Sequence, residues 1–160
     1  MRLRAVALSR SVSMTLARDP DAHLSGTTDA AKLSLPLSWW RVLAPEALDM
    51  AAQCRLSAAL NATQPLPSPD WSAACRGDSA AAIHIALNVL AEAIAFPGRL
   101  DPAMSAICLC AARGDGSCID LLVHVLGRRA RRRADLEVFC LAHAWCSAPR
   151  RGADRVCVAR

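Results

Sequence analysis

Hydrophobic side chains between residues 78 and 127 recur at helical steps, and two sharp breaks divide this stretch. In its first segment, residues 80–96, apolar positions recur at steps of three and four, and a polar stripe runs beside them. The apolar stripe consists of Ile83, Leu87, Leu90 and Ile94, and the polar stripe of His84, Asn88 and Glu92. This pattern predicts a helix with one buried face. The helix should end at Pro97-Gly98, because proline lacks a backbone donor and glycine tolerates a left-handed exit.

A second helix follows directly. Asp101 before Pro102 predicts an N-cap with proline at the first helical position. The buried side of this helix should consist of Met104, Ile107, Cys108 and Ala111. An Arg-Gly-Asp-Gly turn at residues 113–116 ends it.

A third helix is predicted for residues 121–126. Ser117 and Asp120 have the spacing of a capping box, and Gly127 stands where a C-cap glycine belongs. Three consecutive helices with their own start and stop signals predict the core of a domain.

The segment before this core carries a tryptophan pair. Residues 33–43 predict a short helix that starts after Pro36, and Leu35, Trp39 and Val42 or Leu43 are expected to face inward. Trp39 and Trp40 are adjacent, so on a helix they point about 100° apart. Either both belong to the core, or one anchors the core and the other is a candidate for a partner-binding surface.

A longer helix and a connector follow the tryptophans. Residues 45–61 predict a helix whose buried stripe consists of Leu48, Ala52, Leu56 and Ala59 or Leu60. Three prolines at positions 65, 67 and 69 exclude a helix over residues 63–70 and predict an extended connector.

The last predicted helix covers residues 135–146. Its buried side should consist of Leu136, Phe139, Cys140 and His143, with Val138, Leu141 and Trp145 widening the apolar face. Pro149 ends this segment, and residues 150–160 predict one extended segment.

Composition sets the fold class. Hydrophobic residues make up 54% of the chain and tyrosine is absent, which favours helices packed on helices over a sheet. We therefore predict an all-α fold, a single compact multi-helix domain with a Pro-rich connector. Residues 1–32 are expected to form a partly disordered N-terminal arm, with a targeting segment as the alternative, and residues 33–160 the helical domain. No run of apolar residues reaches the length of a membrane span.

The net charge of +5 is concentrated at one end of the chain. Residues 1–126 carry a net charge of −1 and residues 127–160 a net charge of +6. Much of this charge lies in one short run, which consists of Arg128, Arg129, Arg131, Arg132 and Arg133. Three interpretations stay open: a solvated helix end, a surface for an acidic protein partner, and a nucleic-acid contact.

Chemistry-bearing residues do not form a recognisable catalytic motif. Pairing Cys140 with His143, or Ser117 or Cys118 with His124, lacks the third, orienting group that nucleophilic catalysis needs. A zinc site from Cys140, His143 and Cys146 with Cys108 or Cys118 lacks the short-spaced cysteine pairs of structural zinc sites. We predict a protein that is not an enzyme and has no cofactor, with its eight cysteines as free thiols in a reducing compartment.

Four segments, read in order, carry a family resemblance. They are residues 19–24 (Asp-Pro-Asp-Ala-His-Leu), residues 35–41 (Leu-Pro-Leu-Ser-Trp-Trp-Arg), residues 87–127 with Ala-Glu-Ala-Ile at 91–94, and residues 139–149 continued by Arg-Val-Cys-Val at 155–158. In this order the chain resembles the YscK (SctK) family, the cytoplasmic accessory subunit of the type III secretion sorting platform.

The resemblance implies a mostly helical, non-enzymatic adaptor in the cytoplasm, peripheral to the inner-membrane secretion apparatus. Such an adaptor would join the cytoplasmic domain of the inner-membrane ring protein to the pod-forming platform subunit. The candidate partner-binding residues are Trp39, Trp40, Arg128, Arg129, Arg131, Arg132 and Arg133. The alternative function is a basic nucleic-acid-binding or regulatory module that uses the arginine run.

Overall fold

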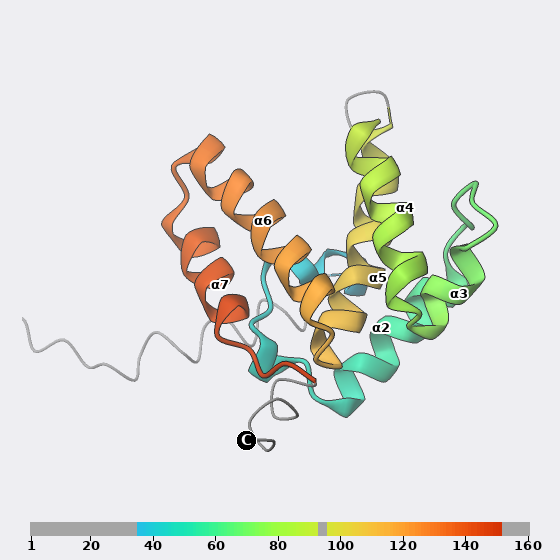
Figure 1. The fold of residues 1–160 in the computed structure, drawn as a ribbon, viewed down its shortest axis with the longest axis horizontal. Coiled ribbons are helices and arrows are strands. Elements are labelled where there is room, and N and C mark those ends of the chain that lie inside the picture. The colour runs from blue at the N-terminus through green and yellow to red at the C-terminus, as the bar shows by residue number, and fades with distance from the viewer. Residues whose placement is uncertain (1–34, 93–95, 152–160) are drawn as a thin grey trace, which may run out of the picture.

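The computed structural model describes residues 35–92 and 96–151, and these contain helices and no strand (Figure 1). The all-α prediction is confirmed. The elements, in order, are the 3₁₀ helices η1 (Pro36–Arg41) and η2 (Pro45–Ala47), then α2 (Met50–Ala62), α3 (Trp71–Arg76), α4 (Ser79–Ala91), η3 (Pro97–Arg99), α5 (Leu100–Ala112), α6 (Gly116–Arg133) and α7 (Leu136–Cys146). The predicted N-terminal arm, and the predicted extended segment beyond residue 151, lie outside the described residues.

The central element is α5. Every residue from Pro102 to Ala111 is buried, because α2, α4, α6 and η1 all pack against this helix. The predicted stripe of Met104, Ile107, Cys108 and Ala111 is therefore buried. However, the other sides of the helix are buried as well, so the stripe is not a distinct buried face. Asp101 is not the N-cap, since the helix begins at Leu100 after η3. Instead, its carboxylate accepts hydrogen bonds from Trp40 and Arg41 of η1.

The prediction for α4 is wrong in its end and in its buried face. The helix ends at Ala91, and its buried residues are Ala81, Ala82, Ile85, Ala86 and Val89. Leu87 of the predicted stripe is 52% exposed, and Ile94 lies outside the described residues. Both sides of this helix are apolar, and the alanine-rich side is the one that is buried. The periodicity alone therefore could not choose between them.

The prediction for α6 is too short at both ends. Asp115, rather than Ser117, is the N-cap, and it accepts a hydrogen bond from the Cys118 backbone N–H at 2.9 Å. Gly127 lies inside the helix, which continues through the arginine run to Arg133. Arginine is a good helix former, and cations near a helix C-terminus are favoured by the helix dipole.

The elements before α4 match the prediction in part. The buried residues Leu48, Ala52, Leu56 and Leu60 are confirmed, and residues 63–70 contain no helix. However, α2 begins only at Met50, after η2, with Asp49 as its N-cap. The sequence pattern does not predict the short helix α3, because six residues are too few for a periodic signal.

No helix among the described residues is both long enough and apolar enough to cross a membrane.

Asp115 also connects the start of α6 to the start of α4. Burial raises the pKa of this carboxyl, but hydrogen bonds from the Cys118 N–H and from the Ser79 hydroxyl more than offset burial and leave its pKa below the ordinary value. Because the folded-state pKa lies below the unfolded-state value, the carboxylate stabilises the fold above the unfolded-state pKa. That contribution disappears as the pH falls through the folded-state pKa.

We therefore expect Asp115→Ala to lower the free energy of unfolding by about 1 kcal/mol at neutral pH, as for other N-cap replacements. Urea denaturation at several pH values measures this difference, which should become smaller in acid as the charge of the carboxylate is lost. Asp115→Asn is the control, because an amide keeps a cap acceptor but does not titrate. If the alanine variant and the wild type differ in free energy of unfolding by the same amount at neutral and acid pH, the stabilisation by the ionised Asp115 carboxylate is contradicted.

Candidate functional site

Both candidate tryptophans lie in the core. The exposed fractions are 4% for Trp39 and 1% for Trp40. The Trp40 Nε1–H donates to Asp101 Oδ1 at 3.0 Å, and the Arg41 guanidinium lies 4.9 Å from the Trp40 ring centroid. The Trp39 ring has Arg55 at 5.3 Å from its centroid. Of the two alternatives, the structure therefore supports two core tryptophans, and neither offers a surface for a partner.

The five candidate arginines lie in the last turns of α6, but they do not act as one group. Four are exposed: Arg128, Arg131, Arg132 and Arg133. Arg129 is half-buried, and its Nε has no hydrogen-bond partner among the described residues. Burial, and next the charges of Arg133 and Arg41, lower the pKa of Arg129. The exposed four have no carboxylate within ion-pair distance in the described part of the chain, so they are available to an external anion.

The largest exposed apolar surface on the final helix is one that the sequence predicted to be buried. Leu136 is 73% exposed and Phe139 is 55% exposed, and Cys140 and His143 of the same stripe are exposed as well. We call these four residues the α7 outer face. The prediction that this side packs inward is wrong. Its i, i+3, i+4, i+7 spacing is visible in the sequence, but spacing alone does not distinguish a core side from a binding side.

The opposite side of α7 packs on α6 and fixes the rotation of the helix. Its buried residues are Val138, Leu141, Ala142 and Trp145. The Trp145 Nε1–H donates to the Leu43 carbonyl oxygen at 3.1 Å, in a bond that joins α7 to a residue far away in the sequence. Asp135 caps the first turn by accepting from the Val138 N–H at 3.1 Å. These contacts hold α7 with its outer face turned away from the core.

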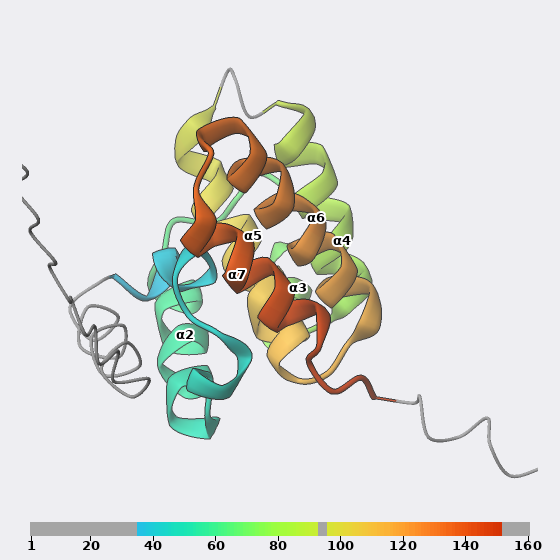
Figure 2. The ribbon, with the colours of Figure 1, turned by 90° about the vertical axis from the view of Figure 1, so that its left-hand side faces the viewer.

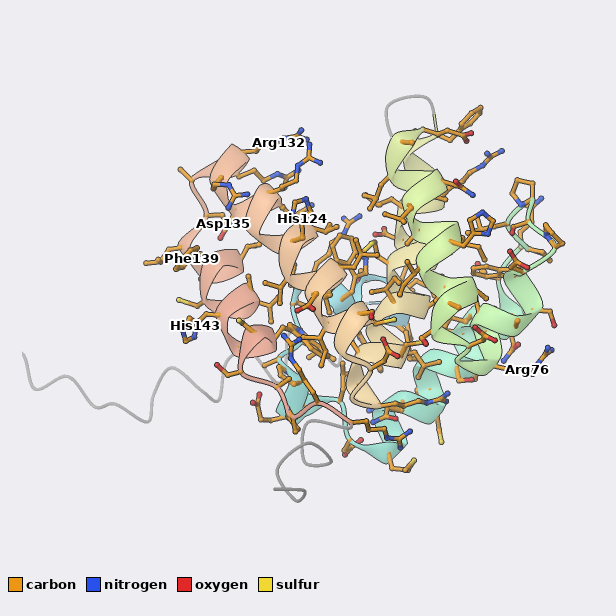
Figure 3. The ribbon with its side chains drawn as sticks, viewed as in Figure 1. Arg76, His124, Arg132, Asp135, Phe139 and His143 are labelled. Atoms are coloured by element: carbon orange, nitrogen blue, oxygen red, sulfur yellow. The ribbon has the colours of Figure 1, made fainter. Side chains whose placement is uncertain are left out.

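The α7 outer face and Arg132 lie on different sides of the α6–α7 hairpin. Figure 3 shows Phe139 and His143 projecting from the side of α7 that faces away from α6. Arg132 and His124 project from α6 on the side toward α4 (Figure 3). A partner that covers the α7 outer face therefore need not contact Arg132.

The residues considered for catalysis or metal binding are not gathered into a site. Cys140, His143 and Cys146 are exposed along α7, whereas Cys118 is buried and His124 is exposed on α6. The side-chain hydrogen bond to Cys110, together with burial, raises the pKa of the Cys118 thiol, so it is a poor nucleophile. Burial raises the pKa of Cys108 to about 12. Within residues 35–92 and 96–151, no three His, Cys, Asp or Glu side chains are grouped to hold a metal ion.

No protein-family model, curated protein or solved structure matches this chain.

Proposed function

We propose that this chain is a non-enzymatic adaptor protein that binds a helix of a protein partner on the α7 outer face. The observation that supports this proposal is the exposure of Leu136 and Phe139, one turn apart on an ordered helix. Large apolar side chains exposed together on one helix face are typical of protein-interaction sites. Burying both would contribute about 1.5–3 kcal/mol for each side chain.

A helix is the partner element that fits this surface best. The α7 outer face presents side chains at i, i+3, i+4 and i+7, which is the spacing that helices use to pack against other helices. His143 and Cys140 continue the stripe toward the C-terminal end of α7 and add polar atoms at its edge. The partner should therefore present a mainly apolar helix face with polar flanks.

The setting of this adaptor comes from the resemblance to the YscK (SctK) family. One segment that carries the resemblance, residues 139–149, contains Phe139, Cys140 and His143 of the α7 outer face. We propose that the protein acts in the cytoplasm, where it joins the inner-membrane ring protein of a type III secretion system to the pod-forming platform subunit. The adaptor needs no cofactor for this task, because binding alone performs it.

Co-expression with these two partners from the same genome tests the proposal. We expect the tagged chain to co-purify with the pod-forming subunit or with the cytoplasmic domain of the ring protein. In the complex, alkylation of Cys140 should be slower than in the free chain. The absence of both partners from the purified material would refute the type III secretion setting. Co-purification with an unprotected Cys140 would refute the α7 outer face as the docking site.

The four exposed arginines of α6 support a second candidate function, nucleic-acid binding. They carry four positive charges within the last turns of one helix and have no ion pair in the described part of the chain. Arginines placed in this way can neutralise phosphates and release counterions.

A salt titration separates this candidate from the adaptor. If the arginines bind DNA, the logarithm of the affinity falls linearly with the logarithm of salt concentration, and replacing all four by glutamine lowers the slope by about one for each phosphate that is no longer neutralised. For the adaptor we expect negligible DNA affinity at physiological salt, in the wild type and in the variant alike. Fluorescence anisotropy with duplex and single-stranded DNA measures both. Tight, salt-sensitive binding that is absent from the variant would make nucleic-acid binding the first choice.

A further inference from the structure

A groove lies at the opposite end of α6 from the arginine run. It has a volume of about 410 Å³, within the range of ligand-binding clefts. Its lining comes from α2, from the end of α5 and from the segment after α7, and consists of Met50, Gln53, Cys54, Ser57, Ala112, Arg113 and Arg151. An 18-residue helix separates it from the arginine run, which corresponds to about 27 Å at 1.5 Å per residue. Figure 1 shows the two ends of α6 far apart, and Figure 2 shows the chain after α7 running past the lower end of the bundle.

Arg113 is held in the groove by the turn between α3 and α4. Its Nη1 donates to the Arg76 carbonyl oxygen at 3.0 Å. Gly77, which follows Arg76 in the chain, has a positive φ of 94°. A Cβ built at this glycine would lie 1.8 Å from Arg113 Nη1. A side chain at this position would therefore displace the guanidinium, and the positive φ independently favours glycine there.

Arg151 is held by the turn between α5 and α6. Its backbone N–H donates to the Gly114 carbonyl oxygen at 2.7 Å. Gly114 also has a positive φ, 88°, and a Cβ there would lie 3.1 Å from Arg151 Cγ. Each of the two arginines of the groove is thus packed against a glycine that adopts the left-handed conformation: Arg113 through its guanidinium and Arg151 through its backbone and Cγ.

The side chains that line the groove include two cations and are partly apolar. No acidic side chain lines it, and neither Arg113 nor Arg151 forms an ion pair with another described residue. Three carboxylates at neighbouring helix starts keep their negative charge but do not line the groove: Asp49 accepts from Ala52 N–H, Asp78 from Ala81 N–H and Asp115 from Cys118 N–H. Met50 and Ala112 provide an apolar wall, and Gln53 and Ser57 provide hydrogen-bonding groups.

We propose that this groove binds a short acidic peptide segment of a protein partner. A carboxylate of the peptide pairs with the guanidinium groups of Arg113 and Arg151, because charge-assisted pairs of this kind are among the stronger polar contacts. An apolar side chain next to that carboxylate covers Met50 and Ala112. A free inorganic anion would use the cations but leave the apolar wall uncovered, which favours a peptide. This proposal stands on the groove alone and does not depend on the α7 outer face.

Cys54 reports occupancy of the groove directly, because its exposed thiol lines the groove. The experiment measures alkylation of Cys54 by iodoacetamide, with Cys140, exposed on α7, as the internal control. Three probes are compared: Ac-Leu-Glu-Glu-Leu-NH₂, its counterpart Ac-Leu-Gln-Gln-Leu-NH₂, and inorganic phosphate. We expect the acidic peptide to slow alkylation of Cys54 in a saturable way, with the Cys140 rate unchanged. The glutamine peptide and phosphate should protect neither thiol.

Two variants connect this protection to the cations. Arg151→Gln keeps the backbone bond to Gly114 and should weaken binding of the acidic peptide by about tenfold, the effect expected for removing one charge-assisted pair. Arg113→Gln should have a similar effect, and its thermal unfolding shows whether the turn at Gly77 stays folded. Arg128→Gln, an exposed arginine at the far end of α6, is the matched control and should leave the affinity unchanged.

Three results would overturn the proposal. They are an unprotected Cys54 in the wild type, equal protection by the acidic and glutamine peptides, and protection by phosphate alone, which would indicate a small-anion site. All three concern Cys54, whereas the adaptor proposal is tested on Cys140, so failure of one leaves the other standing.

Discussion

Replacing Trp40 with alanine is expected to lower the free energy of unfolding by about 3–5 kcal/mol, the range for truncating a buried tryptophan. The indole is 1% exposed, and its Nε1–H donates to Asp101 at 3.0 Å. The alanine variant leaves a cavity between η1 and α5 and removes one donor from the Asp101 carboxylate. Since small domains are stable by about 5–15 kcal/mol, this single change removes a large fraction of the total.

Urea denaturation followed by circular dichroism measures this decrease. Trp40→Phe is the matched control, because it keeps most of the buried ring area and removes only part of the volume and the N–H donor. Its free energy of unfolding should therefore fall between those of the alanine variant and the wild type. An alanine variant as stable as the wild type but impaired in partner binding would show that Trp40 belongs to an interface and not to the core.

Replacing Leu136 and Phe139 together by glutamate should weaken binding of the adaptor's partner by about 100-fold or more, since a residue at the centre of an interface contributes about 2 kcal/mol or more. Both side chains project into solvent, and neither contributes to the buried side of α7. The free energy of unfolding should therefore change by no more than about 0.5 kcal/mol, as is usual for surface replacements.

The matched control for this pair is Leu87→Glu. Leu87 is an exposed leucine on α4, so the control adds negative charge to another helix. Isothermal titration calorimetry with the purified pod-forming subunit or ring-protein domain measures the affinities. If the Leu87 variant binds as weakly as the Leu136 and Phe139 variant, the effect comes from added charge. An unchanged affinity in both variants would place the docking site elsewhere.

Most of the helix positions follow from local signals in the chain, so they could be predicted without the fold. An N-cap such as Asp135 bonds a backbone N–H three residues later, so its effect does not depend on distant residues. Three prolines in residues 63–70 exclude a helix there for an equally local reason. The buried stripe of α2 was also predictable, because polar residues such as Gln53, Arg55 and Asn61 interrupt its other sides.

The end of α6 was not predictable in the same way. A glycine such as Gly127 can end a helix or lie inside it, and the chain around it decides which. Ala130, beyond that glycine, is buried, and burial of its side chain keeps the helix going through the arginine run. As a result the candidate arginines lie on a helix, with Arg129 half-buried and the other four exposed.

Which sides of α4 and α7 are buried depends on packing between distant parts of the chain. Both helices are apolar on more than one side, so several rotations about the helix axis satisfy the hydrophobic pattern equally well. Contacts between residues far apart in the sequence select one rotation for each helix. The alanine-rich side of α4 is buried, and α4 packs on α5. On α7, the Trp145 Nε1–H donates to the Leu43 carbonyl oxygen. The α7 outer face is exposed for this reason, because the side with the tryptophan gains both the packing and the buried hydrogen bond, and Phe139 is left facing solvent.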